Sequence, residues 1–104
     1  MIRIMLACAG GFSTSLLMNK MLDEAKKRGV EVTVNAIGEK TVENHLGEFD
    51  VLLLGPQVRF MLPSIKKLLN GTCPADVIDM RDYGTMNGAK VFATAMELYE
   101  NHNK

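Results

Sequence analysis

The sequence has 104 residues, with twelve Lys and Arg against twelve Asp and Glu, so its formal net charge is zero. This length predicts a single domain over residues 1–104 that buries a core without staples. The neutral balance argues against a nucleic-acid-binding or anionic-membrane surface. No apolar run approaches membrane-spanning length, and the two cysteines, Cys8 and Cys73, form no Cys-x-x-Cys pair. We therefore expect a cytoplasmic protein with reduced thiols, without a leader peptide, direct membrane insertion, metal or cofactor.

Residues 2–8 (IRIMLAC) form an apolar run that predicts a core strand ending at Cys8. Gly10-Gly11 and the hydroxyl residues 13–15 follow, before helical spacing begins at Leu16. A strand, a small-residue turn and a helix start direct backbone N–H groups and the positive end of a helix dipole at one spot. We expect Cys8 to lie at that spot.

A thiol in this environment is predicted to ionise easily. Cysteines at helix N-termini have pKa values lowered to about 3.5–7.5, because the N–H groups and the helix dipole stabilise the thiolate. The same donors would hold a phosphoryl group on sulfur, which makes Cys8 a candidate nucleophile. The alternative is an ordinary buried cysteine, since Cys is among the most buried residue types. Burial alone does not call for two glycines and three hydroxyl residues downstream, which favours the nucleophile.

Helical and strand patterns alternate along the rest of the chain. In order, they predict a helix from Leu16 that Gly29 ends, a half-polar strand over 30–37, a short helix over 41–46 capped by Thr41, an apolar strand over 50–54, a helix over 58–69 that Pro63 distorts or delays, a short strand over 75–80, a connecting segment over 81–84 and a helix from Asn87.

This alternation predicts a three-layer α/β fold, with an open, parallel four-stranded sheet and helices on both faces. The two most apolar strands, 2–8 and 50–54, belong in the middle, so the expected strand order is 2-1-3-4. Ligands in such sheets bind outside the carboxyl ends of the strands. We therefore expect the loop 55–57 (GPQ) and the segment 81–84 (RDYG) on the same rim as Cys8.

The spacing from Cys8 to Thr14-Ser15 resembles the phosphate loop of low-molecular-weight tyrosine phosphatases. That family has an Arg where this chain has Thr14, and its general acid is the Asp of an Asp-Pro pair, which does not occur here. Without the guanidinium group and the acid, hydrolysis of a cysteine phosphate should be slow. A phosphoryl group on Cys8 would then persist until an acceptor arrived.

Three segments together indicate a family. Residues 8–17 (CAGGFSTSLL), 53–57 (LLGPQ) and 78–84 (IDMRDYG) resemble the enzyme IIB component of the bacterial sugar phosphotransferase system (PTS), lactose/cellobiose family. The resemblance covers nearly the whole chain in order. It implies that a cysteine takes a phosphoryl group from a histidine of enzyme IIA and passes it to a sugar held by the membrane component IIC. It also implies a β-linked disaccharide such as cellobiose, chitobiose or lactose.

The resemblance assigns roles to particular residues. Cys8 matches the phosphorylated cysteine of the family. The residues that match its phosphate-binding loop are Ala9, Gly10, Gly11, Phe12, Ser13, Thr14 and Ser15. Phosphoryl transfer needs little from the protein beyond the nucleophile, in-line positioning and charge stabilisation.

Other side chains have two interpretations each. Gln57 either donates to the phosphoryl oxygens or caps its own helix, and Tyr83 either shields the thiophosphate or uses its hydroxyl locally. Residues 59–61 belong either to a docking face or, as we favour, to helix packing with a solvated Arg. His45 and His102 are either phosphohistidine sites or metal ligands or, as we favour because they are isolated, surface histidines. Cys73 is expected to be inert.

Three other functions share parts of this pattern. A low-molecular-weight phosphatase or arsenate reductase is the alternative enzyme, and Thr14 in place of Arg argues against it. A flavodoxin-like cofactor binder could use the hydroxyl-rich loop for the FMN phosphate, but few aromatic residues are present to sandwich a flavin. A response-regulator receiver should have acidic residues where the first strand ends, and this chain has Leu6-Ala7-Cys8 there.

Overall fold

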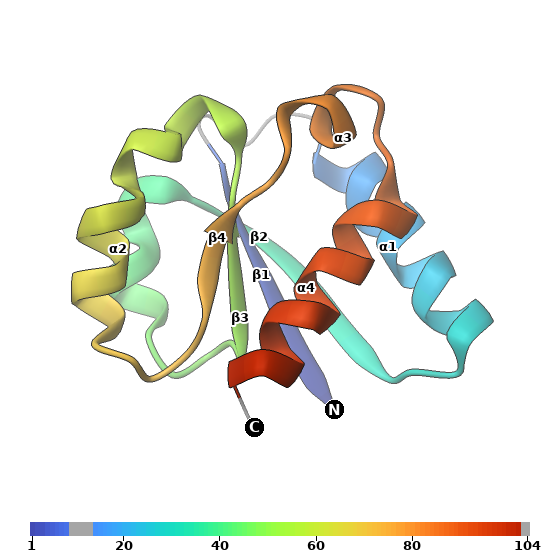
Figure 1. Ribbon diagram of the computed structural model, residues 1–104, viewed down its shortest axis with the longest axis horizontal. Coiled ribbons are helices and arrows are strands. Elements are labelled where there is room, and N and C mark those ends of the chain that lie inside the picture. The colour runs from blue at the N-terminus through green and yellow to red at the C-terminus, as the bar shows by residue number, and fades with distance from the viewer. Residues whose placement is uncertain (9–13, 103–104) are drawn as a thin grey trace.

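The fold is described by a computed structural model, which covers residues 1–8 and 14–102 (Figure 1). Its elements in chain order are β1 (Ile2–Cys8), α1 (Thr14–Arg28), β2 (Val32–Gly38), the 3-10 helix η2 (Glu39–His45), β3 (Val51–Leu54), the 3-10 helix η3 (Pro56–Met61), α2 (Leu62–Leu69), β4 (Ala75–Val77), α3 (Met80–Gly84) and α4 (Gly88–His102).

The four strands form one parallel sheet in the order β2-β1-β3-β4. Helices α1 and α4 cover one face of the sheet, and α2 and η2 lie on the other face (Figure 1). The predicted architecture and strand order are therefore confirmed. The apolar content of the strands predicts their order correctly. The inner strand β3 is buried along its whole length, whereas the edge strand β2 has only one buried residue, Val34.

The core consists of two clusters, one on each face of the sheet. Alternate residues of β1 point to opposite faces, as strand geometry requires. Ile4, Leu6 and Cys8 pack in one cluster with residues of α1 and α4, including Leu17 and Phe92. The other cluster includes Met5, Ala7, Leu52, Leu54, Phe49, Ile65 and Leu69. Cys8 therefore lies on the face that α1 and α4 cover.

Two predicted helix boundaries are confirmed. Gly29 has a φ of +68° and ends α1, and its N–H donates to Lys26 O at 3.1 Å, while Val30 N–H donates to Ala25 O at 2.9 Å. This pair of bonds is the Schellman arrangement, which satisfies the last carbonyl groups of the helix. Pro63 delays the next helix as expected, because the chain runs through η3 before α2 begins with the proline in its first turn.

Two local predictions are wrong. Thr41 does not cap the short helix, because η2 begins earlier with Gly38 at its N-cap, and the Thr41 hydroxyl donates instead to Gly38 O at 2.8 Å. The strand predicted over 75–80 ends at Val77, and the segment after it is not an open connection but the helix α3. The Asp79 side chain stabilises its start by accepting the Arg81 N–H at 3.4 Å.

Candidate functional site

Cys8 is the last residue of β1 and lies at the carboxyl-end rim of the sheet. Its side chain is only 1% exposed. The first residues of η3 and the helix α3 come to the same rim, since they directly follow β3 and β4 (Figure 1). Gly55, the residue before η3, and Tyr83 of α3 both act on Cys8. The predicted meeting of the loop 55–57 and the segment 81–84 with Cys8 is therefore confirmed.

The lack of a side chain at Gly55 leaves room for the side chains of Cys8 and Gln57. A Cβ atom at this position would lie 2.6 Å from Gln57 Oε1 and 3.1 Å from Cys8 Sγ. The φ of Gly55 is −63°, which any residue adopts, so the backbone does not require glycine here. Glycine keeps Gln57 in its present position, because the Cys8 sulfur and the Gln57 amide border the same small volume. Gly55 also donates its N–H to Ala7 O at 2.9 Å, which fixes the loop to β1.

Gln57 and Tyr83 form a chain of polar contacts that ends at the cysteine. Gln57 Nε2 donates to the Tyr83 hydroxyl at 3.4 Å, and that hydroxyl lies close enough to the Cys8 thiol to lower its pKa. The capping interpretation of Gln57 is wrong, because no side chain caps η3. The hydroxyl of Tyr83 has local partners, as one of its two interpretations expected. Donation by Gln57 to a phosphoryl group stays a prediction.

Burial raises the pKa of the Cys8 thiol, so the predicted lowering is wrong. The hydrogen bonds from Tyr83 and from the backbone of Gly55 act in the opposite direction, and the negative charge of Glu39 adds to the increase. The predicted amide donors of residues 9–13 lie outside the described residues. Loss of water around the sulfur thus outweighs the two donors that are described.

Tyr83 stays protonated and can donate. Burial is the main cause of the raised pKa of its hydroxyl, and a negative charge on Cys8 would raise it further. A phenol beside a thiolate therefore keeps its proton and points it at the sulfur. This arrangement provides a neutral donor, on a half-buried side chain, to an anion at the buried sulfur.

Most of the predicted phosphate-binding residues lie outside the described part of the chain. This applies to Ala9, Gly10, Gly11, Phe12 and Ser13. The last two predicted residues, Thr14 and Ser15, are the first two of α1, and Ser15 is exposed. No acidic residue lies in the first turn of α1, so the positive end of this helix is not neutralised by its own side chains.

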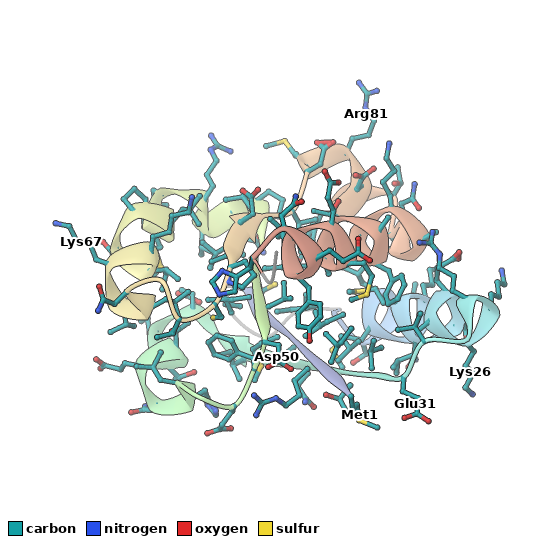
Figure 2. All side chains as sticks on the ribbon, turned by 60° about the horizontal axis from the view of Figure 1, so that its bottom comes forward. Met1, Lys26, Glu31, Asp50, Lys67 and Arg81 are labelled. Atoms are coloured by element: carbon teal, nitrogen blue, oxygen red, sulfur yellow. The ribbon has the colours of Figure 1, made fainter. Side chains whose placement is uncertain are left out.

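No guanidinium group replaces the missing loop arginine at this rim, as far as the described residues show. Arg81 lies on α3 beside Tyr83, but its side chain extends away from the body of the protein into solvent (Figure 2). Arg59 on η3 is also exposed. Phe60, which we assigned to helix packing, is 74% exposed, so that assignment is wrong for this residue.

The remaining titratable candidates lie apart from the cysteine. His45 contacts Glu48 Oε1 at 3.1 Å, and His102 is exposed near the end of α4. Cys73 is half-buried, and burial raises its pKa. In residues 1–8 and 14–102, no group of three or more His, Cys, Asp or Glu is placed to hold a metal ion. Over the same residues, none of the helices has the length and apolarity to cross a membrane.

Sequence reasoning missed Glu39 and the steric role of Gly55. Glu39 directly follows β2, whose last residue, Gly38, pairs with Cys8 in the sheet. The rule that placed residues 55–57 and 81–84 on the rim therefore also applies to Glu39. The role of Gly55 had no such signal, because it depends on where the side chain of Gln57 turns.

Comparison with solved structures identifies the class of fold. A YwlE mutant from Bacillus subtilis, a low-molecular-weight tyrosine phosphatase, matches with a TM-score of 0.50 and 16% identity, over 98% of this chain and 94% of that one. The cellobiose-specific phosphotransferase IIB component from Borrelia burgdorferi matches with a TM-score of 0.79 and 35% identity, over 97% of this chain and 94% of that one. The chain thus has an α/β fold with a four-stranded parallel sheet, which it shares with a PTS IIB component and with a low-molecular-weight tyrosine phosphatase.

Sequence comparison identifies the family. Residues 3–94 match the family described as "PTS system, Lactose/Cellobiose specific IIB subunit". The galactose-specific and cellobiose-specific EIIB components of Lactococcus lactis are each 46% identical over 101 residues, which cover 91% of this chain and 94% of theirs. The oligo-beta-mannoside-specific EIIB component of Bacillus subtilis is 35% identical over 95% of this chain and 97% of its own. The protein belongs to the lactose/cellobiose IIB family of the PTS, and its members are phosphotransferases.

Proposed function

We propose that Cys8 carries the phosphoryl group in this phosphotransferase. Its Sγ accepts the group from a phosphohistidine of enzyme IIA and passes it to a sugar bound by the membrane component IIC, in the cytoplasm. The observation that carries this proposal is the position of Cys8 at the end of β1, on the rim where η3 and α3 bring Gly55 and Tyr83 to the sulfur. Residues 1–104 would form one IIB domain.

The chemistry consists of two displacements at phosphorus. In the first, the Cys8 thiolate attacks, the S–P bond forms, and the N–P bond breaks with its electron pair left on the histidine nitrogen. In the second, a sugar hydroxyl oxygen attacks, the O–P bond forms, its proton passes to a base, and the thiolate leaves. The amides of residues 9–15 and the start of α1 would hold the phosphoryl oxygens.

The family supports a proposal for the sugar and the partners. The sugar would be a β-linked disaccharide such as cellobiose, chitobiose or lactose, which is supported by the cellobiose-specific and oligo-beta-mannoside-specific relatives. Docking of IIA and IIC would be transient, as in other relays. It is supported by three exposed apolar side chains on the elements that meet at this rim: Leu16 (51% exposed), Phe60 (74%) and Met80 (62%).

Transfer from a radiolabelled phospho-IIA of a related system tests the proposal. Label should appear on Cys8, and Cys8→Ser should accept none, because an alkoxide forms far less readily than a thiolate. Cys73→Ser is the matched control and should be labelled like the wild type. Label on His45 or His102, or none on the wild type, would contradict the proposal. Rapid release of phosphate from an aryl phosphate would favour the phosphatase alternative instead.

A further inference from the structure

The burial of Cys8 creates an electrostatic problem for the proposed reaction. The sulfur must be negatively charged when it attacks phosphorus, and it becomes negatively charged again when the sugar displaces it. A buried anion is destabilised unless hydrogen bonds replace the lost water. The side chain of Cys8 is 1% exposed and belongs to the core cluster beneath α1 and α4.

Among the described residues, one side-chain donor lies close enough to this sulfur to lower its pKa. That side chain is Tyr83 of α3, which packs against the core cluster that contains Cys8. The other described donor is the backbone of Gly55, whose N–H already donates to Ala7 O at 2.9 Å. The phenol is therefore the donor best placed to respond to a change of charge on the sulfur.

Gln57 orients the phenol. An O–H group rotates about its C–O bond, and a donor on the acceptor side of its oxygen favours the orientation in which the hydrogen points at the sulfur. Gln57 Nε2 donates to the Tyr83 oxygen at 3.4 Å, which occupies that side. The amide reaches this position through the space that Gly55 leaves open.

We infer that Tyr83 is a positioning residue that stabilises the Cys8 thiolate in both half-reactions, and that Gln57 holds the Tyr83 hydroxyl in the donating orientation. This inference rests on the proposed function and adds a role for the rim that neither the family nor the relatives' names assign. The thiolate is the nucleophile in the first displacement and the leaving group in the second. A donor that stabilises it therefore lowers the barrier to forming the nucleophile and the barrier to its departure.

The pH dependence of Cys8 alkylation by iodoacetamide tests the inference directly, because only the thiolate reacts. The parent protein carries Cys73→Ser so that Cys8 is the only thiol. Tyr83→Phe keeps the ring and removes the donor, so its alkylation midpoint should move upward by about one pH unit. Gln57→Leu should move it upward by less, since the phenol remains. Tyr99→Phe, on α4, is the matched control and should leave the midpoint unchanged.

A variant of opposite sign separates this effect from a general loosening of the fold. Among the described residues, the titratable side chains that act on Cys8 are Tyr83 and Glu39. Glu39→Gln removes a negative charge and should lower the midpoint, whereas a loosened site would shift every variant in the same direction. Phosphoryl acceptance from phospho-IIA by Tyr83→Phe should fall about tenfold at neutral pH and recover at higher pH.

The outcomes are distinguishable. An unchanged midpoint in Tyr83→Phe, measured on folded protein, would overturn the inference, and so would a loss of thermal stability without a shift of the midpoint. If Tyr83→Phe does not fold, an unchanged midpoint in Gln57→Leu overturns it equally. If the midpoints shift as expected but phospho-IIA labels no variant and not the parent, the proposed function fails while the thiolate donor stands.

Discussion

The side chain of residue 55 is a single hydrogen atom, and the sulfur of Cys8 and the amide of Gln57 lie where a larger group would be. A methyl group there would contact Gln57 Oε1 at 2.6 Å, which is shorter than any normal contact. The atom in the way is the far end of a flexible side chain and not the backbone. The clash is therefore relieved by movement of Gln57, and it acts on the site and not on the fold.

Gly55→Ala is accordingly expected to separate function from stability. Stability should change by less than about 1 kcal/mol, because the φ of −63° suits alanine. Phosphoryl acceptance should slow about fivefold, since a displaced Gln57 loses its hydrogen bond to Tyr83, and a neutral hydrogen bond contributes about 1 kcal/mol. Chemical denaturation and transfer from phospho-IIA measure the two quantities. Wild-type transfer rates in the variant would show that the position of Gln57 is immaterial.

At this scale the sequence predicted the place of Cys8 correctly and its ionisation wrongly. The place follows from a local pattern, an apolar strand ended by small residues. The pKa depends on how completely other segments cover the sulfur, and Tyr83, 75 positions later in the chain, is one of them. The contact between Gln57 and Tyr83 was unpredictable for the same reason, because their sequence separation of 26 carries no periodic signal.

Helices α1 and α4 pack closely side by side over one face of the sheet, and Gly88 makes this approach possible. A Cβ atom on Gly88 would lie 2.4 Å from Lys20 Cβ, 2.7 Å from the Lys20 carbonyl carbon and 2.8 Å from Met21 N. Two of these three atoms belong to the backbone of α1 and cannot rotate away. The first residue of α4 thus sets the distance between the two helices.

Gly88→Ala should therefore destabilise the protein by about 1–3 kcal/mol, as overpacking of a tight interface does. Gly84→Ala, in α3, is the matched control, because the added methyl group would meet no atom of another part of the structure within 4 Å. Urea denaturation of both variants provides the comparison. Equal urea midpoints for the two variants would mean that α4 moves away from α1 at little cost in free energy. The close approach of the two helices would then not limit stability.

Elements were predictable to different degrees. Long periodic segments such as α1 and α4 were found from their spacing, and the strands from their apolar runs. The short helix α3 was missed, because one turn contains too few residues to display a period. Its start depends on the side chain of Asp79, which accepts the Arg81 N–H, and the same residues fit an open turn equally well.

For the molecule as a whole, the Arg3–Asp50 pair connects β1 to the segment that leads into β3. Asp50 accepts hydrogen bonds from Arg3 Nη2 at 3.0 Å, from Nε at 3.2 Å and from the Arg3 backbone N–H at 2.8 Å. These contacts lower the pKa of Asp50 below its ordinary value of 3.8, with the Arg3 side-chain hydrogen bond as the main cause. The ionised carboxylate therefore stabilises the folded state.

The sign of this linkage gives a pH-dependent prediction. Because the pKa of Asp50 is lower in the folded state, its carboxylate contributes fully to the free energy of unfolding above about pH 3.8. This contribution is lost as the pH falls through the folded-state pKa. Asp50→Asn should show a small decrease of the urea midpoint at neutral pH, since the pair is partly exposed, and no decrease in strong acid. Glu31→Gln, at an exposed position, serves as the control. A difference that is constant across the pH range would rule out the charge as its origin.

The overall architecture was the most predictable level. Strand order followed from which strands are apolar on both faces, and the location of the rim followed from the parallel topology. Those are rules about repeated elements, and they tolerate errors at single residues such as Thr41. The chemistry of the site depends on contacts between side chains from β1, η3 and α3, and a sequence specifies these only through the finished fold.

The N-terminus and the carboxyl end of α4 lie at the amino-end rim of the sheet, opposite η3 and α3 (Figure 1). An affinity handle or a fluorescent protein joined to either end would therefore project away from Cys8. If the molecule is immobilised by either terminus, the carboxyl-end rim with Cys8 would face the solution. Capture experiments with either partner can accordingly be designed with both orientations as mutual controls.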